Sequence, residues 1–115
     1  KALKGAKVLV LGIAYKKDVD DMRESPAVAL MELMKAKGAI VHYTDPYVPV
    51  FPKMREHHFD LSSVDPTPQH IGSYDVLLLV TDHSKFDYAM FQQYATLIVD
   101  TRGVYLDSLP NVVKA

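Results

Sequence analysis

The sequence contains no cysteine. This absence excludes disulfide bridges, metal sites built on thiolates and a cysteine nucleophile within the chain. The formal net charge is only −1, so no overall electric field attracts the protein to nucleic acid or to an anionic membrane. Any anion that the protein binds must therefore be held by a local cluster of positive side chains.

Long apolar runs are also missing. No run approaches the roughly 20 residues that a membrane span requires, and the first residues, Lys1 to Gly5, contain no apolar signal-peptide segment. We therefore expect a soluble, cytoplasmic protein with no nucleic-acid or membrane partner. The 115 residues suit a single domain with one buried core. A hydrophobic share of 49% is ordinary for such a domain.

The stretch from Lys7 to Pro26 joins a short apolar run to a charged loop and a helix start. Val8 to Leu11 is typical of a strand buried on both faces, and the chain leaves this strand at Gly12. Ser25-Pro26 has the pattern of a helix N-cap followed by proline at the first helical position. Proteins of the α/β class commonly hold anions between such a strand and such a helix N-terminus. We therefore predict that the functional site lies here.

Strands alternate with helices along the rest of the chain, which predicts a Rossmann-like doubly wound parallel sheet with helices on both faces. The expected strands are residues 7–11, 40–44, 75–81 and 97–100, with short strands at 59–64 and 112–113. The expected helices are residues 26–36, 68–73 and 88–94. In this architecture ligands bind at the carboxyl ends of the strands. The loop after the first strand, Asp45, residues 81–83 and Arg102 all belong to that edge.

Residues 11–27, Leu-Gly-Ile-Ala-Tyr-Lys-Lys-Asp-Val-Asp-Asp-Met-Arg-Glu-Ser-Pro-Ala, closely resemble the opening of a known domain. It is the C-terminal, UDP-binding domain of the UDP-glucose/GDP-mannose dehydrogenase family. The resemblance continues in residues 43–49, 80–83 and 99–102, and so covers essentially the whole chain. The sequence of the first loop, which has no proline after its lysines, is more similar to that of UDP-N-acetylhexosamine dehydrogenases than to that of UDP-glucose dehydrogenases.

The resemblance implies that residues 1–115 form a single UDP-sugar-binding domain, a C-terminal fragment of a longer enzyme. That enzyme would be an NAD-dependent nucleotide-sugar 6-dehydrogenase, which oxidises the C6 alcohol to a uronic acid. Its catalytic cysteine lies in another domain, so we expect no catalytic residue and no activity in this chain alone. The implied partners are a UDP-sugar and the N-terminal and central domains of the same enzyme, which as a whole would form a homo-oligomer.

Three residues are candidates for substrate binding: Tyr15, Lys16 and Arg102. A lysine and an arginine suit a diphosphate, although neighbouring lysines on a loop are often only solvated. The alternatives are packing for Tyr15 and a salt bridge to Asp100 for Arg102. The resemblance implies that Tyr15 and Lys16 contact the UDP-sugar and that Arg102 contacts its nucleotide part.

Arg23 is the candidate for cofactor binding. The resemblance implies that it reaches the NAD, which the absent N-terminal domain mainly binds; the alternative is an ion pair with a neighbouring acid such as Asp20 or Asp21. Asp45 ends a strand where NAD-binding Rossmann domains place a ribose-binding acid. The first loop, however, contains one glycine instead of G-x-G-x-x-G, so Asp45-Pro46 is better interpreted as a turn.

No metal site is expected. His57, His58 and His70 lie in an irregular region and are interpreted as solvated, whereas His83 falls at the ligand edge and is expected to shape the crevice. A second hypothesis is a free-standing Rossmann-like nucleotide-binding regulatory module without catalysis. A receiver-like signalling domain is rejected because Asp20-Asp21 lies eight residues beyond Gly12 rather than directly after the strand.

Overall fold

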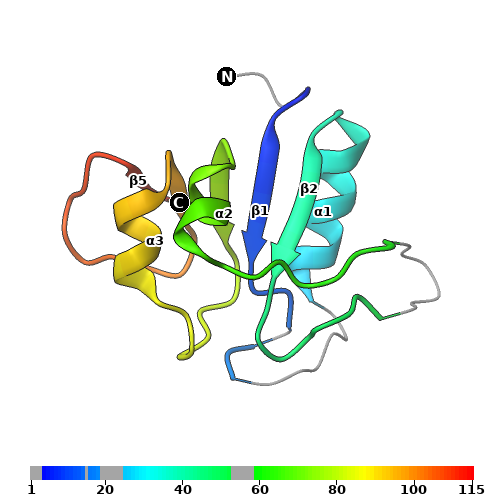
Figure 1. The fold of residues 1–115 in the computed structure, drawn as a ribbon, viewed down its shortest axis with the longest axis horizontal. Coiled ribbons are helices and arrows are strands. Elements are labelled where there is room, and N and C mark those ends of the chain that lie inside the picture. The colour runs from blue at the N-terminus through cyan, green and yellow to red at the C-terminus, as the bar shows by residue number, and fades with distance from the viewer. Residues whose placement is uncertain (1–3, 15, 19–24, 53–58) are drawn as a thin grey trace.

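A single parallel sheet organises the computed structural model, which describes residues 4–14, 16–18, 25–52 and 59–115. Its five strands lie in the order β2-β1-β3-β4-β5, and all neighbouring pairs are parallel (Figure 1). The strands are β1 (Lys7–Leu11), β2 (Ile40–Thr44), β3 (Val76–Leu79), β4 (Ile98–Asp100) and β5 (Val112–Lys114). The chain runs from β1 out to β2 and then returns to the other side of β1, so the winding reverses between β1 and β3. The predicted doubly wound sheet is confirmed.

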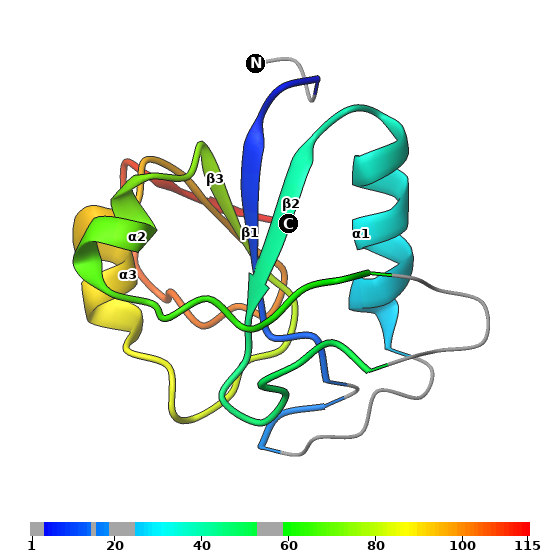
Figure 2. The same ribbon diagram turned by 45° about the vertical axis from the view of Figure 1, so that its right-hand side comes forward.

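Helices cover both faces of the sheet. α1 (Pro26–Ala36) lies on one side of β1 and β2, and α2 (Pro68–Gly72) and α3 (Tyr88–Tyr94) lie on the other (Figure 2). The strand β1 separates two hydrophobic clusters, because its alternate side chains point to opposite faces. Val8 and Val10 pack in the cluster that contains Met31 of α1. Leu9 and Leu11 pack in the other, and this explains why β1 is apolar at every position after Lys7.

The helix starts follow from local capping. The Ser25 hydroxyl accepts a hydrogen bond from the main-chain N–H of Ala27, and Pro26 needs no partner at the first helical position. The Asp87 carboxylate caps α3 by accepting from the N–H of Met90 at 3.1 Å. Both helices therefore begin where these residue types predict. No helix in the described part of the chain is long and apolar enough to cross a membrane.

Two expected strands differ clearly from the sequence prediction, and β4 and β5 differ from it by one residue at one end. β3 ends at Leu79 because the N–H groups of Val80 and Thr81 both donate to the carbonyl of Leu11, which ends the regular ladder. The strand expected at residues 59–64 was wrong: in the described residues this segment forms only an isolated bridge, between Val50 and Ser62. It pairs with residues 49–51, where Pro49 has no N–H to extend the row of donors.

Candidate functional site

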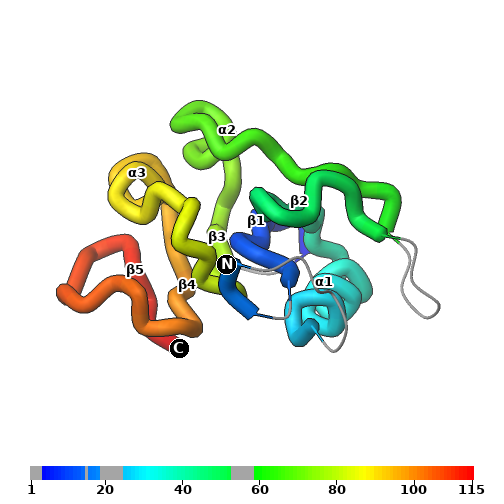
Figure 3. The backbone as a smooth tube through the Cα atoms, turned by 90° about the horizontal axis from the view of Figure 1, so that it is seen from below, coloured from blue at the N-terminus to red at the C-terminus, as the bar shows by residue number. Residues whose placement is uncertain are grey.

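The loops that follow the strands meet at the carboxyl edge of the sheet, which Figure 3 shows from below. The described part of the loop after β1, residues 12–14 and 16–18, lies against the loop after β3, residues 80–87. Gly12 has a φ of +83°, and a Cβ at this position would lie only 2.4 Å from the carbonyl oxygen of Thr81. The Thr81 hydroxyl in turn donates to the carbonyl of Ala14 at 2.7 Å. Only glycine permits this close approach, so Gly12 brings the first loop to the end of β3.

Asp45 is the acid that connects β2 to the first loop. It is 1% exposed, and its Oδ2 accepts the main-chain N–H groups of Ile13 at 2.9 Å and Ala14 at 3.1 Å. Its Oδ1 accepts the N–H of Tyr47 at 2.8 Å, which forms the predicted turn. Burial raises the pKa of Asp45, but hydrogen bonds from His83, Ile13 and Tyr47 outweigh burial and hold this pKa below its ordinary value. Asp45 is therefore an ionised acid that fixes two loops.

His83 connects the same carboxylate to Asp18, further along the first loop. Its side chain and that of Asp45 are both fully buried, and its Nε2 lies 2.8 Å from Asp45 Oδ2. Its Nδ1 accepts the main-chain N–H of Asp18 at 2.8 Å. The rings of Tyr47 and Phe86 pack against the imidazole, with centroids 4.8 Å and 5.5 Å away. His83 thus lies in the wall of the site rather than facing the solvent.

Asp18 joins the first loop to the loop after β3 through its side chain as well. Its carboxylate accepts the N–H and the hydroxyl of Ser84, each at 2.7 Å. These hydrogen bonds lower the pKa of Asp18. Asp18 has a φ of 62°, a left-handed conformation that aspartate adopts more readily than most residues. The segment 16–18, which contains Lys16, is therefore tied to residues 83–84.

Asp100 fixes the loop after β4, as Asp45 fixes the loop after β1. It is 1% exposed, and its carboxylate accepts the main-chain N–H groups of Arg102, Gly103 and Tyr105, each at 2.9 Å. These bonds shape the loop but leave no salt bridge to the Arg102 guanidinium. Arg102 Nε instead lies 3.5 Å from Asp82 Oδ1, in a pair whose arginine side chain is 53% exposed. The alternative of a salt bridge between Arg102 and Asp100 is thus not what the structure has: Asp100 holds the backbone of Arg102, and Asp82 faces its side chain.

Of the four residues predicted for the site, two lie within the described residues. Lys16 and Arg102 are both exposed, and the loops that carry them both contact the segment 82–84. Tyr15 and Arg23 lie outside the described residues, as do His57 and His58. His70 is exposed, as expected. Among the described residues, no group of three or more histidine or acidic side chains could hold a metal ion.

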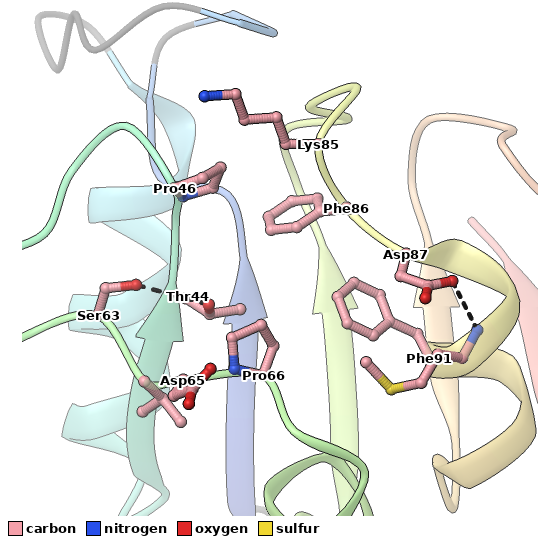
Figure 4. A pocket seen from close by; sticks show the side chains of 11 residues that line it. Thr44, Pro46, Ser63, Asp65, Pro66, Lys85, Phe86, Asp87 and Phe91 are labelled. Atoms are coloured by element: carbon pink, nitrogen blue, oxygen red, sulfur yellow. Dashed lines mark hydrogen bonds between the residues drawn. The ribbon is translucent and has the colours of Figure 1, made fainter.

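A cavity of about 360 Å³ lies beside this edge, on the face that α3 covers. Figure 4 shows Phe86 and Phe91 facing Thr44, Pro46 and Pro66 across it. Its lining residues are Thr44, Pro46, Ser63, Val64, Asp65, Pro66, Lys85, Phe86, Asp87, Met90 and Phe91. Neither Lys16 nor Arg102 is among them, so the two predicted cations stand on the open edge outside this cavity.

The sequence did not indicate the pairing of Asp45 with His83. The only signal was positional, because Asp45 directly follows β2 and His83 lies in the loop after β3, and the carboxyl ends of parallel strands share one edge. On sequence grounds we expect His83 to shape the crevice; the structure places it fully buried beneath this edge, and its part in ligand binding stays a prediction.

Residues 9–108 match the UDP-glucose/GDP-mannose dehydrogenase family, UDP binding domain. The chain belongs to this family. It is 37% identical over 109 residues to the putative UDP-glucose 6-dehydrogenase YtcA of Bacillus subtilis, covering 90% of this chain and 25% of that protein. It is 31% identical over 104 residues to the UDP-N-acetyl-D-mannosamine dehydrogenase of Escherichia coli, covering 86% of this chain and 23% of the relative.

The fold agrees with this membership. The crystal structure of NDP-N-acetyl-D-galactosaminuronic acid dehydrogenase from Methanosarcina mazei matches all of this chain and 25% of its own, with a TM-score of 0.75 and 25% sequence identity. The chain thus spans about a quarter of the length of the curated relatives it matches. Each of these relatives is named as a dehydrogenase or a putative one, which favours the dehydrogenase interpretation over a free-standing regulatory module.

Proposed function

We propose that this domain binds the UDP part of a nucleotide sugar at the carboxyl edge of its sheet, with Lys16 and Arg102 contacting the nucleotide diphosphate. The observation that carries the proposal is that both loops lie beside residues 82–84: Asp18 is hydrogen-bonded to His83 and Ser84, and Arg102 Nε lies 3.5 Å from Asp82 Oδ1. Two positive side chains from separate loops suit the two phosphates of a UDP moiety.

The present partner of Arg102 is easily exchanged for a ligand. The pair with Asp82 is long at 3.5 Å and largely exposed, and such pairs contribute about 0–1 kcal/mol. A phosphate offers the guanidinium two parallel hydrogen bonds instead of one weak contact. Ligand binding would therefore gain more at Arg102 than it loses at Asp82. Tyr15 is proposed as a further contact to the UDP-sugar, next to Lys16 in sequence.

We further propose that residues 1–115 are one domain of a longer NAD-dependent nucleotide-sugar 6-dehydrogenase that converts the C6 alcohol to a uronic acid. The catalytic groups and most of the NAD site then belong to the N-terminal and central domains, and the whole enzyme is a homo-oligomer. Relatives named for UDP-glucose and for UDP-N-acetyl-D-mannosamine match this chain to a similar degree, so the proposed substrate class is a UDP-sugar.

The described residues do not fit an NAD of their own. In a Rossmann NAD site, the acid after the second strand binds the ribose. Here that acid is Asp45, which is 1% exposed and whose two oxygens already accept hydrogen bonds from Ile13, Ala14, Tyr47 and His83. Arg23 is proposed to reach toward NAD bound by the other domains.

Calorimetric titration of this chain with UDP, UDP-sugars, ADP and NAD tests the proposed ligand. We expect the uridine nucleotides to bind and NAD to bind much more weakly or not at all. A preference for NAD, or equal binding of UDP and ADP, would contradict a uridine diphosphate site. Lys37→Ala is a suitable control variant, because Lys37 is an exposed lysine at the end of α1, at the amino edge of the sheet.

A further inference from the structure

His83 has two hydrogen-bond partners that together define its chemical state. The main-chain N–H of Asp18 can only donate, so Nδ1, at 2.8 Å, must present a lone pair. The Asp45 carboxylate can only accept, so Nε2, also at 2.8 Å, must carry the hydrogen. Both ring nitrogens of a fully buried imidazole are therefore satisfied only in its neutral Nε2–H form.

We propose that His83 is a positioning residue for the ligand site: it holds the loop that carries Lys16 by accepting the N–H of Asp18, while Asp45 orients its ring. The inference rests on the proposed function, since the ligand that Lys16 would meet is the UDP diphosphate. Asp45 supports the loop at two places, directly through the N–H groups of Ile13 and Ala14 and indirectly through His83.

Of the hydrogen bonds that hold Asp18, the one to His83 is the least exposed to water. The two bonds from Ser84 to the Asp18 carboxylate are exposed to water, whereas the bond to His83 is partly buried. Water competes for exposed hydrogen bonds, and a buried acceptor that loses its donor has no such substitute. Lys16 precedes Asp18 by two residues, so a shift of the Asp18 backbone moves the point from which the lysine side chain extends.

The groups that surround the imidazole leave its position fixed. Tyr47 and Phe86 pack against its faces and edges, and the Tyr88 hydroxyl donates to the carbonyl of His83 at 2.7 Å. Lys85 lies over the ring of Tyr47, 4.9 Å from its centroid. With the ring held by Asp45 and these neighbours, His83 presents its Nδ1 to the first loop as a fixed acceptor.

Two substitutions separate the two bonds of His83. The amide of asparagine reaches the place of Nδ1 and can accept from Asp18, but it does not reach Asp45. The amide of glutamine reaches the place of Nε2 and can donate to Asp45, but it offers no acceptor at the place of Nδ1. His83→Gln should therefore keep the support of Asp45 and release the loop, whereas His83→Asn should keep the loop and leave Asp45 without one of its donors.

The test measures urea unfolding and UDP affinity of this chain in both variants, with His70→Gln as a control at an exposed histidine of α2. We expect His83→Gln to keep most of the stability but to bind UDP about five- to tenfold more weakly, since only part of its loop population is competent. We expect His83→Asn to be the less stable variant and to recover most of the lost affinity. A residue that only stabilised the fold would lower affinity in step with stability, and that result overturns the proposal.

A measurement on the unsubstituted chain tests this hydrogen bond separately from the proposed binding of UDP. In nitrogen-15 NMR spectra, Nδ1 of His83 should have the shift of an unprotonated ring nitrogen, with a scalar coupling to the Asp18 amide nitrogen across the hydrogen bond. The Asp18 amide should exchange slowly in the unsubstituted chain and in His83→Asn, and fast in His83→Gln. A protonated Nδ1 or a missing coupling overturns the inference. If the coupling is present but UDP does not bind, the proposed function fails while the anchoring of the loop by His83 stands.

Discussion

Replacement of Asp45 by asparagine removes the charge at the centre of the loop contacts and changes little else. The carboxylate accepts four hydrogen bonds, three at Oδ2 and one at Oδ1. The asparagine amide can place its oxygen at the position of Oδ2 and keep the three bonds there in a weaker, neutral form. Its NH₂ group then faces the N–H of Tyr47, and two donors oppose each other.

The expected cost follows from these changes. A hydrogen bond to a charged group contributes about 1.5–3 kcal/mol and a neutral one about half as much, and a buried donor without a partner costs about 1–3 kcal/mol. Burying an uncharged amide costs less than burying a carboxylate, which offsets part of the loss. We therefore expect Asp45→Asn to lower the free energy of unfolding by about 2–4 kcal/mol. Asp87→Asn is the matched control and should change it by only a few tenths of a kcal/mol, because asparagine caps a helix as well as aspartate does.

Urea unfolding followed by circular dichroism measures both variants, and the dependence on pH gives a second check. The pKa of Asp45 is lowered in the folded protein, so its contribution is present above the unfolded pKa of about 4 and is lost as the pH falls through the folded pKa. The difference between the parent chain and Asp45→Asn should therefore shrink in acid. A loss of less than about 1 kcal/mol at neutral pH, or a difference that persists unchanged in acid, would refute the assignment of Asp45 as an ionised acceptor.

Two further predictions concern the backbone and the buried tyrosines. Gly12→Ala should lower the free energy of unfolding by about 2–5 kcal/mol, since a left-handed alanine costs about 1–2 kcal/mol and the overlap with Thr81 adds about 1–3 kcal/mol. The control Gly5→Ala, at a position with positive φ but open space, should cost only about 1–2 kcal/mol. Equal losses in the two variants would contradict the close approach of Gly12 to Thr81. Burial, with the Asp45 charge second, raises the pKa of Tyr43 to about 12. Folding should therefore be favoured by this group below about pH 10 and lose that contribution as the pH rises toward 12. Ultraviolet titration of tyrosinate with parallel unfolding curves checks this. Loss of this alkaline decrease in stability in Tyr43→Phe would support the prediction, and an ordinary Tyr43 titration would contradict it.

Local patterns in the sequence were sufficient for most of the fold. Ser25-Pro26 and Asp87 set the beginnings of α1 and α3, because capping involves only residues next to each other in sequence. The apolar run of β1 predicted a central strand, since burial on both faces removes polar alternation. The segment 59–64 was misjudged because its apolar residues pack against the core without forming a ladder.

The sequence predicted which loops share the carboxyl edge of the sheet, but not the contacts between them. That the loops after β1, β3 and β4 share one edge follows from parallel strands alone. The bond between Asp45 and His83 joins residues 38 apart in sequence, and no local pattern encodes it. Likewise, Asp100 is next but one to Arg102, yet main-chain N–H groups use its oxygens and the guanidinium turns to Asp82. Such competition for acceptors depends on the folded arrangement.

The central claim is that Lys16 and Arg102 contact the same uridine diphosphate, and a double-mutant cycle on UDP affinity tests it most directly. We expect Lys16→Ala and Arg102→Ala each to weaken UDP binding about tenfold or more, since each removes a charge-assisted contact of about 1.5–3 kcal/mol. The double variant should depart from additivity by at least about 0.5 kcal/mol, because both side chains would act on one ligand group. Unchanged UDP affinity in either single variant, with Lys37→Ala as the reference, would contradict the account.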